Sequence, residues 1–260
     1  SFNNCNSDRF LIHVRGSRGG TYFIENNHIS NVNLKSNSIA GATYPAWHPD
    51  GRFIAFSANE VRQNFYARPP KSIEVYDLYS YLIVYDKKEN NITYLTGNDS
   101  IVPLQTFPTW SPDGSYLYYC NASFKTKSIN KTLDINEIMN IRYNLERRSF
   151  NPATGSFGKA ELIFEASTIG KSVSFPRISP DGKYMVLTLT DFGTFPVWHE
   201  EADLYLFNLR NGEYKRLNLN SNRAESYHGW SSNGKWLVFS SKRMDGRSSV
   251  PYFAYIGSWN

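Results

Sequence analysis

Imidazole and carboxylate side chains are the groups in this sequence best suited to proton transfer or metal binding. Glu225 stands three residues before His228, and His199 lies in an acidic and aromatic stretch. If the fold brings His199, Glu225 and His228 together, two imidazoles and one carboxylate could bind a ligand or a metal ion. Hydrogen-bonded structural histidines are commoner than metal sites, so we predict a polar binding cluster and no metal. His48 falls in a turn and is expected at the surface.

Other familiar catalytic patterns are missing from the sequence. There is no Gly-x-Ser-x-Gly elbow and no phosphate-binding loop. The two cysteines, Cys5 and Cys120, form no Cys-x-x-Cys pair, so a thiolate metal site is not supported. We therefore predict no catalytic residue and no cofactor. Whether the chain is an enzyme stays open, with a binding role favoured.

The composition limits the class of protein and of partner. Hydrophobic residues make up 40% and aromatic residues 16%, enough for a sizeable core rich in strand-forming side chains. The net charge of +5 comes from 28 basic and 23 acidic residues without a long run of either sign, so nucleic-acid binding is not expected. All apolar runs are strand-sized, so no transmembrane helix is expected. The chain begins with Ser and shows no signal peptide, which suggests a processed protein or a piece of a longer one.

A nearly identical phrase occurs four times and must position any functional residue. Its copies are YPAWHPDGRFIAF from Tyr44, FPTWSPDGSYLYY from Phe107, FPRISPDGKYMVL from Phe175 and YHGWSSNGKWLVF from Tyr227. In the Ser-Pro-Asp-Gly centre, Pro presets φ, Asp caps the backbone locally and Gly takes the positive φ that closes a hairpin. The fourth copy keeps Asn-Gly, so its turn should form too.

The strand after each turn is apolar on both faces, which is typical of a strand covered by a sheet on either side. A β-propeller supplies that environment, because each blade packs between two neighbours. We therefore predict an all-β fold, a β-propeller of four-stranded antiparallel blades, as a single domain or segment over residues 1–260. About five blades are visible, at 5–40, 41–98, 103–168, 172–222 and 225–260. The first lacks its innermost strand and the last its outermost, so we expect a segment of a six- to eight-bladed ring.

The repeated turn and the strand after it resemble the WD-like propeller repeats of the TolB family, whose signature is Trp-Ser-Pro-Asp-Gly followed by an Ile-Ala-Phe-like strand. The resemblance covers most of the chain. It implies a propeller in the Gram-negative envelope, periplasmic or associated with the outer membrane, with binding as its commoner role. The chain departs from the family in spacing, since its turns lie 63, 68 and 52 residues apart, against roughly 40–45 for a compact blade.

The extra residues fall between the second and third strands of the blades, and these loops all emerge on one face, the long-loop face. Insertions confined to one face of a repeat array usually mark its binding face. The first loop is basic and the third acidic and aromatic, which suits a protein or peptide partner. Residues 134–139, in the second loop, could form a short helix. The candidate binding residues are Arg62, Tyr66, Arg68, Lys71, Trp198, His199, Glu225 and His228.

These observations predict a non-catalytic envelope propeller that acts as a protein or peptide interaction scaffold through its long loops. Three alternatives remain open. The chain could be the propeller of a larger enzyme, a periplasmic glycan-binding module with aromatic stacking platforms, or part of a redox protein. The last follows from related envelope propellers that carry a Cys-x-x-Cys-His haem motif upstream of a stretch like the one around Cys5.

Overall fold

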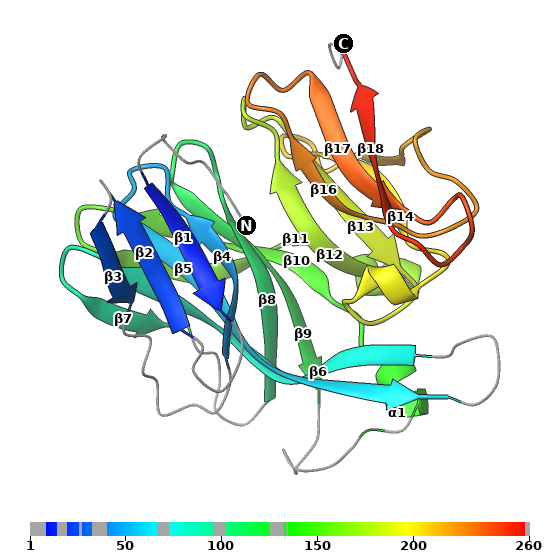
Figure 1. The fold of residues 1–260 in the computed structure, drawn as a ribbon, viewed down its shortest axis with the longest axis horizontal. Helices are drawn as coiled ribbons and strands as arrows, with labels where there is room; N and C mark the ends of the chain where they lie inside the picture. The colour runs from blue at the N-terminus through cyan, green and yellow to red at the C-terminus, as the bar shows by residue number, and fades with distance from the viewer. Residues whose placement is uncertain are drawn as a thin grey trace.

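The computed structural model describes residues 9–14, 20–25, 28–32, 41–66, 73–95, 102–124, 133 and 135–257. These residues form strands almost throughout, with the short helix α1 (Ile135–Met139) and the 3-10 helices η1 (Ala166–Ile169) and η2 (Pro196–Trp198). The predicted all-β class is confirmed, and α1 forms where a short helix was expected. Figure 1 shows the strands gathered into twisted sheets that follow one another around an arc.

The strands follow one another as antiparallel meanders. The first is β1 (Arg9–Val14), β2 (Gly20–Glu25) and β3 (His28–Val32). The second is β4 (Gly41–Trp47), β5 (Phe53–Phe65), β6 (Ile73–Asp86) and β7 (Asn91–Tyr94). The third is β8 (Val102–Trp110), β9 (Tyr116–Phe124), β10 (Asn144–Asn151) and β11 (Ser156–Phe164). Next come β12 (Ser172–Ile178), β13 (Tyr184–Thr190), β14 (Asp203–Asn208) and β15 (Tyr214–Arg216), and then β16 (Glu225–Trp230), β17 (Trp236–Ser241) and β18 (Val250–Tyr255).

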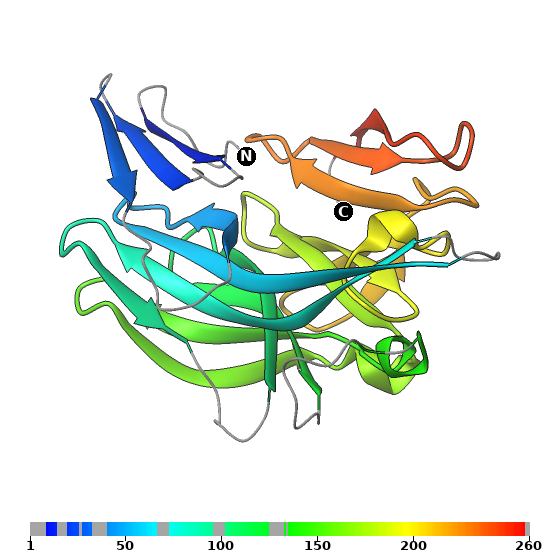
Figure 2. The same cartoon turned by 60° about the horizontal axis from the view of Figure 1, so that its bottom comes forward.

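The meanders are joined by packing more than by hydrogen bonds. A parallel bridge between Ser80 and Leu104 links β6 to β8 and merges two meanders into one eight-stranded sheet. In the described ranges no strand of β1–β3 pairs with a strand of β16–β18. Figure 2 shows these two end sheets at opposite sides of the arc's opening.

The four repeated turns form as predicted. In the second copy, Ser111 Oγ donates to Asp113 Oδ1 at 2.6 Å and accepts from Tyr116 N at 2.9 Å. The Gly114 N–H donates to the Ser111 carbonyl at 2.9 Å. Each copy places its glycine at positive φ: Gly51 (73°), Gly114 (74°), Gly182 (72°) and Gly234 (68°). These turns, at 48–51, 111–114, 179–182 and 231–234, form the turn face, opposite the long-loop face.

The aromatic residue that opens each repeat has a conformation that the sequence did not reveal. Tyr44, Phe107, Phe175 and Tyr227 all have φ between 48° and 53°. Each sits at a β-bulge in β4, β8, β12 or β16, where the pairing register shifts. A bulge with a left-handed residue re-aims one side chain. Here it turns four aromatic rings toward a common centre.

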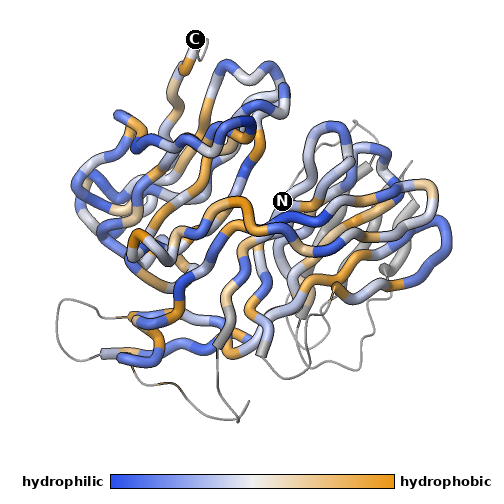
Figure 3. Tube along the Cα trace, turned by 180° about the vertical axis from the view of Figure 1, so that it is seen from behind, coloured by the Kyte–Doolittle hydropathy of each residue, from blue (hydrophilic) through white to orange (hydrophobic). Residues whose placement is uncertain are grey.

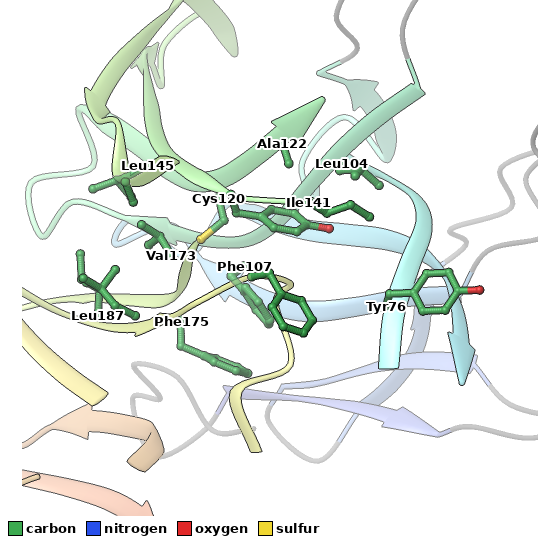
Figure 4. Close-up of a cluster of buried hydrophobic side chains, with 14 of the residues drawn as sticks. Tyr76, Leu104, Phe107, Cys120, Ala122, Ile141, Leu145, Val173, Phe175 and Leu187 are labelled. Atoms are coloured by element: carbon green, nitrogen blue, oxygen red, sulfur yellow. The ribbon is translucent and has the colours of Figure 1, made fainter. Parts of the chain in front are cut away.

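These four rings form an aromatic column between the meanders. The ring centroids lie 4.4 Å apart for Tyr44 and Phe107, 4.0 Å for Phe107 and Phe175, and 4.6 Å for Phe175 and Tyr227. Phe107 is fully buried and Phe175 nearly so. Figure 4 shows Phe107 and Phe175 side by side within the surrounding apolar cluster that includes Cys120, Val173 and Leu187. The centre of the described propeller is therefore filled by side chains.

Neighbouring meanders are also connected by the repeated tryptophan. Trp110 Nε1 donates to the Ala46 carbonyl at 3.1 Å, and Trp230 Nε1 donates to the Arg177 carbonyl at 2.9 Å. Each bond reaches the first strand of another meander, from β8 to β4 and from β16 to β12. The third copy has Ile178 at this position and cannot donate such a bond.

The expectation that His48 is a surface residue was wrong. Its side chain is buried, and Nε2 donates to the Gly114 carbonyl of the next repeated turn at 3.0 Å. The ring also meets Trp110 edge-on at 4.7 Å. The first copy has His where the second and third have Ser, and the larger ring spans the gap to the neighbouring turn.

Apolar side chains gather along the strand interiors. Figure 3 shows hydrophobic stretches within the strands and hydrophilic ones at the turns. The larger core cluster joins the second, third and fourth meanders through residues such as Leu78, Leu104 and Leu187, all fully buried. A smaller cluster joins β13 and β14 to β17 through Val186, Leu204 and Leu237. Strands β5 and β13 are buried on both faces over most of their length, which agrees with the prediction from the apolar strands.

Candidate functional site

A long β-hairpin dominates the described part of the long-loop face. β5 and β6 remain paired from Phe53 and Asp86 out to Phe65 and Ile73, with one irregularity after Glu60. Figures 1 and 2 show this arm leaving its own sheet and running across toward η2. The arm therefore carries residues of the second meander to the third long segment.

His199 anchors the arm. Its Nε2 lies 3.1 Å from Glu74 Oε1 on the arm, and its Nδ1 lies 2.9 Å from Glu201 Oε1. The side chains of His199 and Glu74 are fully buried, and Phe192 packs against the imidazole edge at 4.7 Å. Both ring nitrogens are engaged by carboxylates, so the imidazole has no nitrogen left for a metal ion. This histidine holds two long segments together.

The three residues predicted as a polar cluster belong to separate networks. Glu225 is fully buried and accepts from Ser221 Oγ at 2.6 Å, Ser241 Oγ at 2.7 Å and Arg243 Nη2 at 3.3 Å. His228 Nε2 donates to the Val186 carbonyl at 2.8 Å.

Proton transfer by His228 is disfavoured. Burial lowers the pKa of His228 to about 3, and the charge of Arg177 adds to this effect. His228 is therefore neutral at physiological pH.

The candidates in the first long loop are only partly described. Arg62 lies half exposed and pairs with Glu60 at 2.5 Å. Tyr66 Oη accepts from Asn64 Nδ2 at 3.4 Å. Arg68 and Lys71 lie outside the described residues, as does Cys5.

Trp198 borders a shallow groove beside the anchored arm. The groove has a volume of about 420 Å³ and contains both acidic and basic side chains; its lining includes Ile73, Trp198, Glu200, Glu201, Arg223, Lys242 and Arg247. Lys242 Nζ lies 5.0 Å from the centre of the Trp198 ring, and Arg223 pairs with Glu200. Phe65 and Met244, each 74% exposed, also lie in the segments between second and third strands. Exposed apolar groups beside charges of both signs are typical of a protein-binding surface.

The arm itself contains a buried carboxyl that was not predicted. Asp77 on β6 accepts from Asn59 Nδ2 at 2.9 Å, and Tyr143 Oη lies 3.5 Å from its other oxygen. Burial raises the pKa of Asp77 to about 7, although both hydrogen bonds oppose the shift. An aspartate in a strand pattern of mixed polarity looks like an exposed residue, and its burial is visible only once the fold places Asn59 and Tyr143 against it.

The turn face carries a larger cavity, of about 740 Å³, among the ends of β4, β8, β12 and β16. Phe175 and Tyr227 of the aromatic column line it, together with Trp47, Trp110 and Trp230. Arg177 also lines this cavity, and sequence reasoning missed it. The only signal in the sequence was the replacement of the repeated tryptophan by Ile178 next to it.

Among the described residues, no three His, Cys, Asp or Glu side chains are grouped as a metal site requires. Cys120 is buried and is a free thiol, and burial raises its pKa. In the same part of the chain, no helix has the length and apolar character needed to cross a membrane.

Comparisons with known proteins identify the fold. No protein-family model matches the chain, and no curated protein matches it in sequence. Solved structures do match. A protein assigned as TolB from Agrobacterium tumefaciens has a TM-score of 0.53 at 15% identity, covering 98% of this chain and 76% of its own.

Two enzymes are similar to the chain at the same level. An oligogalacturonate lyase in complex with manganese has a TM-score of 0.50 at 16% identity, over 91% of this chain and 54% of its own. A puromycin-hydrolyzing peptidase of Mycobacterium tuberculosis has a TM-score of 0.56 at 10% identity, over 96% of this chain and 34% of its own. At these identities the likeness concerns the fold alone. The chain has a TolB-like β-propeller fold.

Proposed function

We propose that this chain is a non-catalytic binding propeller that holds a protein or peptide partner on its long-loop face. The observation that carries the proposal is the groove beside Trp198, at the point where His199 anchors the hairpin arm. The arm is fixed by a buried contact between residues 125 positions apart. A surface held in this way is preorganised, which lowers the entropic cost of binding.

The chemistry of the groove favours a peptide over a polyanion. Glu200 and Glu201 lie on one loop and Arg223, Lys242 and Arg247 on others, so a partner meets both signs within a short distance. Trp198 is 38% exposed and supplies the kind of aromatic anchor that dominates protein interfaces. Arg62 and Tyr66, on the arm, would extend this surface, and the predicted roles of Arg68 and Lys71 belong to the same proposal.

The number of blades and the cellular location form part of the proposal. We propose five blades in this chain, at the ranges predicted above, as a segment of a six- to eight-bladed ring. The β16–β18 sheet supports this, because Trp236, Phe253 and Tyr255 remain exposed where a further blade would cover them. The likeness to a TolB structure supports a periplasmic or outer-membrane-associated site.

A size measurement on the protein from its own host tests the binding proposal. A tagged chain should elute with a partner, above the size of the chain alone. Phe65→Ser and Trp198→Ala should release the partner, since each removes an exposed apolar group from the long-loop face. Leu162→Ser removes an exposed apolar group from the outer strand β11 and should leave the complex intact. Equal loss with all three variants would contradict the proposal.

The second candidate is the propeller of a larger enzyme. The similarity to only 34% of the M. tuberculosis peptidase and 54% of the lyase is what favours it. The intact mass and absorbance of the natural protein test it. A mass well above 29.9 kDa would support the enzyme or the haem alternative, and a Soret band would select the haem protein. Titration with neutral oligosaccharides, followed by tryptophan fluorescence, tests the glycan-binding alternative.

A further inference from the structure

The turn-face cavity is lined by side chains from four repeats of the chain. The ends of four first strands surround it, and Phe175 and Tyr227 of the aromatic column lie in its wall. Because the column rings are 4.0 to 4.6 Å apart between successive members, a ligand entering from the turn face meets aromatic side chains instead of an open channel. A pocket of about 740 Å³ is in the size range of small-molecule sites.

The charged side chain that lines this pocket is positive. Arg177 is the single charged residue among those that line it, and no Asp or Glu lines it. In the described part of the chain, the Arg177 guanidinium has one hydrogen bond, from Nη1 to the Pro176 carbonyl at 2.9 Å, and no ion pair. Burial lowers the pKa of Arg177, but an arginine stays charged at neutral pH. His228 is neutral and contributes no compensating charge.

No described carboxylate pairs with this partly buried guanidinium. Because burial without pairing is costly, a bound carboxylate would offset that cost. Flat side chains line the same cavity. Trp47 and Trp230 are partly exposed and line the pocket, so a ring carried by the anion could lie against an indole.

The pocket continues where the repeat is broken. Ile178 replaces the repeated tryptophan, and beside it a second cavity of about 560 Å³ runs between β8–β11 and β12–β15. The two cavities share Ser111, Pro112, Ile178 and Pro180. Arg147, Lys183 and Arg210 line the second cavity together with two carboxylates, and Lys183 Nζ lies 3.7 Å from Asp181 Oδ2. The carboxylates in that cavity, Asp113 and Asp181, are bonded within their own turns.

We propose that the turn-face cavity binds an organic carboxylate, with the carboxylate on Arg177 and its ring against Trp47 or Trp230. Two ligand sources share this chemistry: a sugar acid, and the C-terminal carboxylate of an aromatic residue. This site is separate from the long-loop face and does not depend on the function proposed for that face.

Titration of the purified chain, measured by calorimetry, tests this proposal, and tryptophan fluorescence is used in addition for the sugar-acid probes only. The probes are D-galacturonate with its methyl ester as the neutral control, and N-acetyltryptophan with its amide. We expect at least one acid to bind and its neutral control not to bind. Binding of galacturonate alone supports a sugar acid, and binding of N-acetyltryptophan alone supports a peptide carboxylate. Sulfate binding as tightly as the acids would overturn the proposal, because the site would then take any anion.

Variants separate the role of Arg177 from general charge. Arg177→Gln should weaken binding by about 10- to 100-fold, the usual effect of losing a charged hydrogen bond, and Arg177→Lys should weaken it less. Lys235→Gln removes an exposed charge that does not line the cavity and should leave binding unchanged. Melting curves show whether each variant is folded. Binding of either acid by a folded Arg177→Gln variant at wild-type affinity, or no binding of either acid by the wild type at millimolar concentration, would overturn the proposal.

Discussion

The two faces of this propeller are held together in different ways. On the turn face the same hairpin turn is repeated. In its second and third copies, serine donates to aspartate and the glycine N–H donates to the serine carbonyl, all within a few residues. On the long-loop face, the decisive contact joins Glu74 to His199, across 125 positions. Local and repeated interactions therefore stabilise the hairpin turns of the meanders, whereas single long-range contacts hold the long-loop face, where we propose that a partner binds.

Buried polar groups also have different roles at the two faces. His48, near the turn face, donates to a neighbouring turn and holds two repeats together. His199 and Asp77, near the long-loop face, belong to elements without a counterpart in the other repeats. Substitutions should therefore act on the whole frame at one face and on the arm at the other.

The largest expected effect is at the anchor of the arm. His199→Leu leaves the buried Glu74 carboxylate without its imidazole partner, which should cost about 3–5 kcal/mol of unfolding free energy. His228→Leu is the matched control at the turn-face cavity. It removes one neutral hydrogen bond and should cost about 1 kcal/mol. Urea unfolding measures both, and equal losses would remove the distinction between the two faces.

The pH dependence of stability tests the buried carboxyl of Asp77 on the arm. The pKa of Asp77 is raised to about 7 in the folded protein, against about 4 in an unfolded chain. Between about pH 4 and pH 7, Asp77 therefore keeps its proton in the folded state and has lost it in the unfolded state. The stability this provides is complete below pH 4 and is lost as the pH rises to about 7, at up to about 1.4 kcal/mol per pH unit.

Asp77→Asn cannot titrate and should remove this part of the pH dependence. The measurement is the urea midpoint at several pH values between 4 and 8. An identical pH profile for wild type and variant would show that Asp77 does not titrate in this range.

A substitution in the repeated turn should affect the frame. A Cβ at Gly114 would lie 2.3 Å from His48 Nε2, and φ there is +74°. Gly114→Ala combines a strained backbone with an overlap, so we expect a loss of about 3 kcal/mol. Gly212 has φ +76° and no atom within 4 Å of the added Cβ, so Gly212→Ala should cost only about 1 kcal/mol. Similar losses at the two glycines would show that His48 does not constrain the turn.

The smallest effect is expected for the tryptophan bonds between meanders. Trp230→Phe keeps an aromatic ring but removes the bond to the Arg177 carbonyl, so a loss of about 1 kcal/mol is expected. Ile178→Phe changes the same position of the third copy, where no such bond exists. Comparison of the two melting temperatures checks this, and an unchanged temperature for Trp230→Phe would contradict it.

The sequence predicted the elements that repeat and missed those that occur once. The residues Ser-Pro-Asp-Gly favour a tight turn through their own backbone preferences, so the turns and the all-β class could be predicted from them. The positive φ of Tyr44 and its counterparts was missed, because a large aromatic side chain in a strand pattern gives no sign of a bulge. His48 was misplaced, because its burial depends on the neighbouring turn.

The candidate site was predictable only in outline. Long segments between second and third strands indicated a binding face, and that part remains a prediction. The pairing of His199 with Glu74 and the burial of Asp77 depend on where the arm travels, which no local pattern encodes. Arg177 sits in a strand beside Ile178, where the repeat departs from its pattern. That no acidic side chain of the described residues pairs with it is visible only in three dimensions.

Cross-linking from the two faces tests whether a protein partner binds the long-loop face. A photo-reactive amino acid is placed at Met244 on the long-loop face or at Lys235 on the turn face, and the protein is irradiated in its own host. We expect a discrete protein adduct from Met244, absent from Lys235 and lost when Trp198→Ala is added. An adduct from Lys235 with none from Met244 would contradict it.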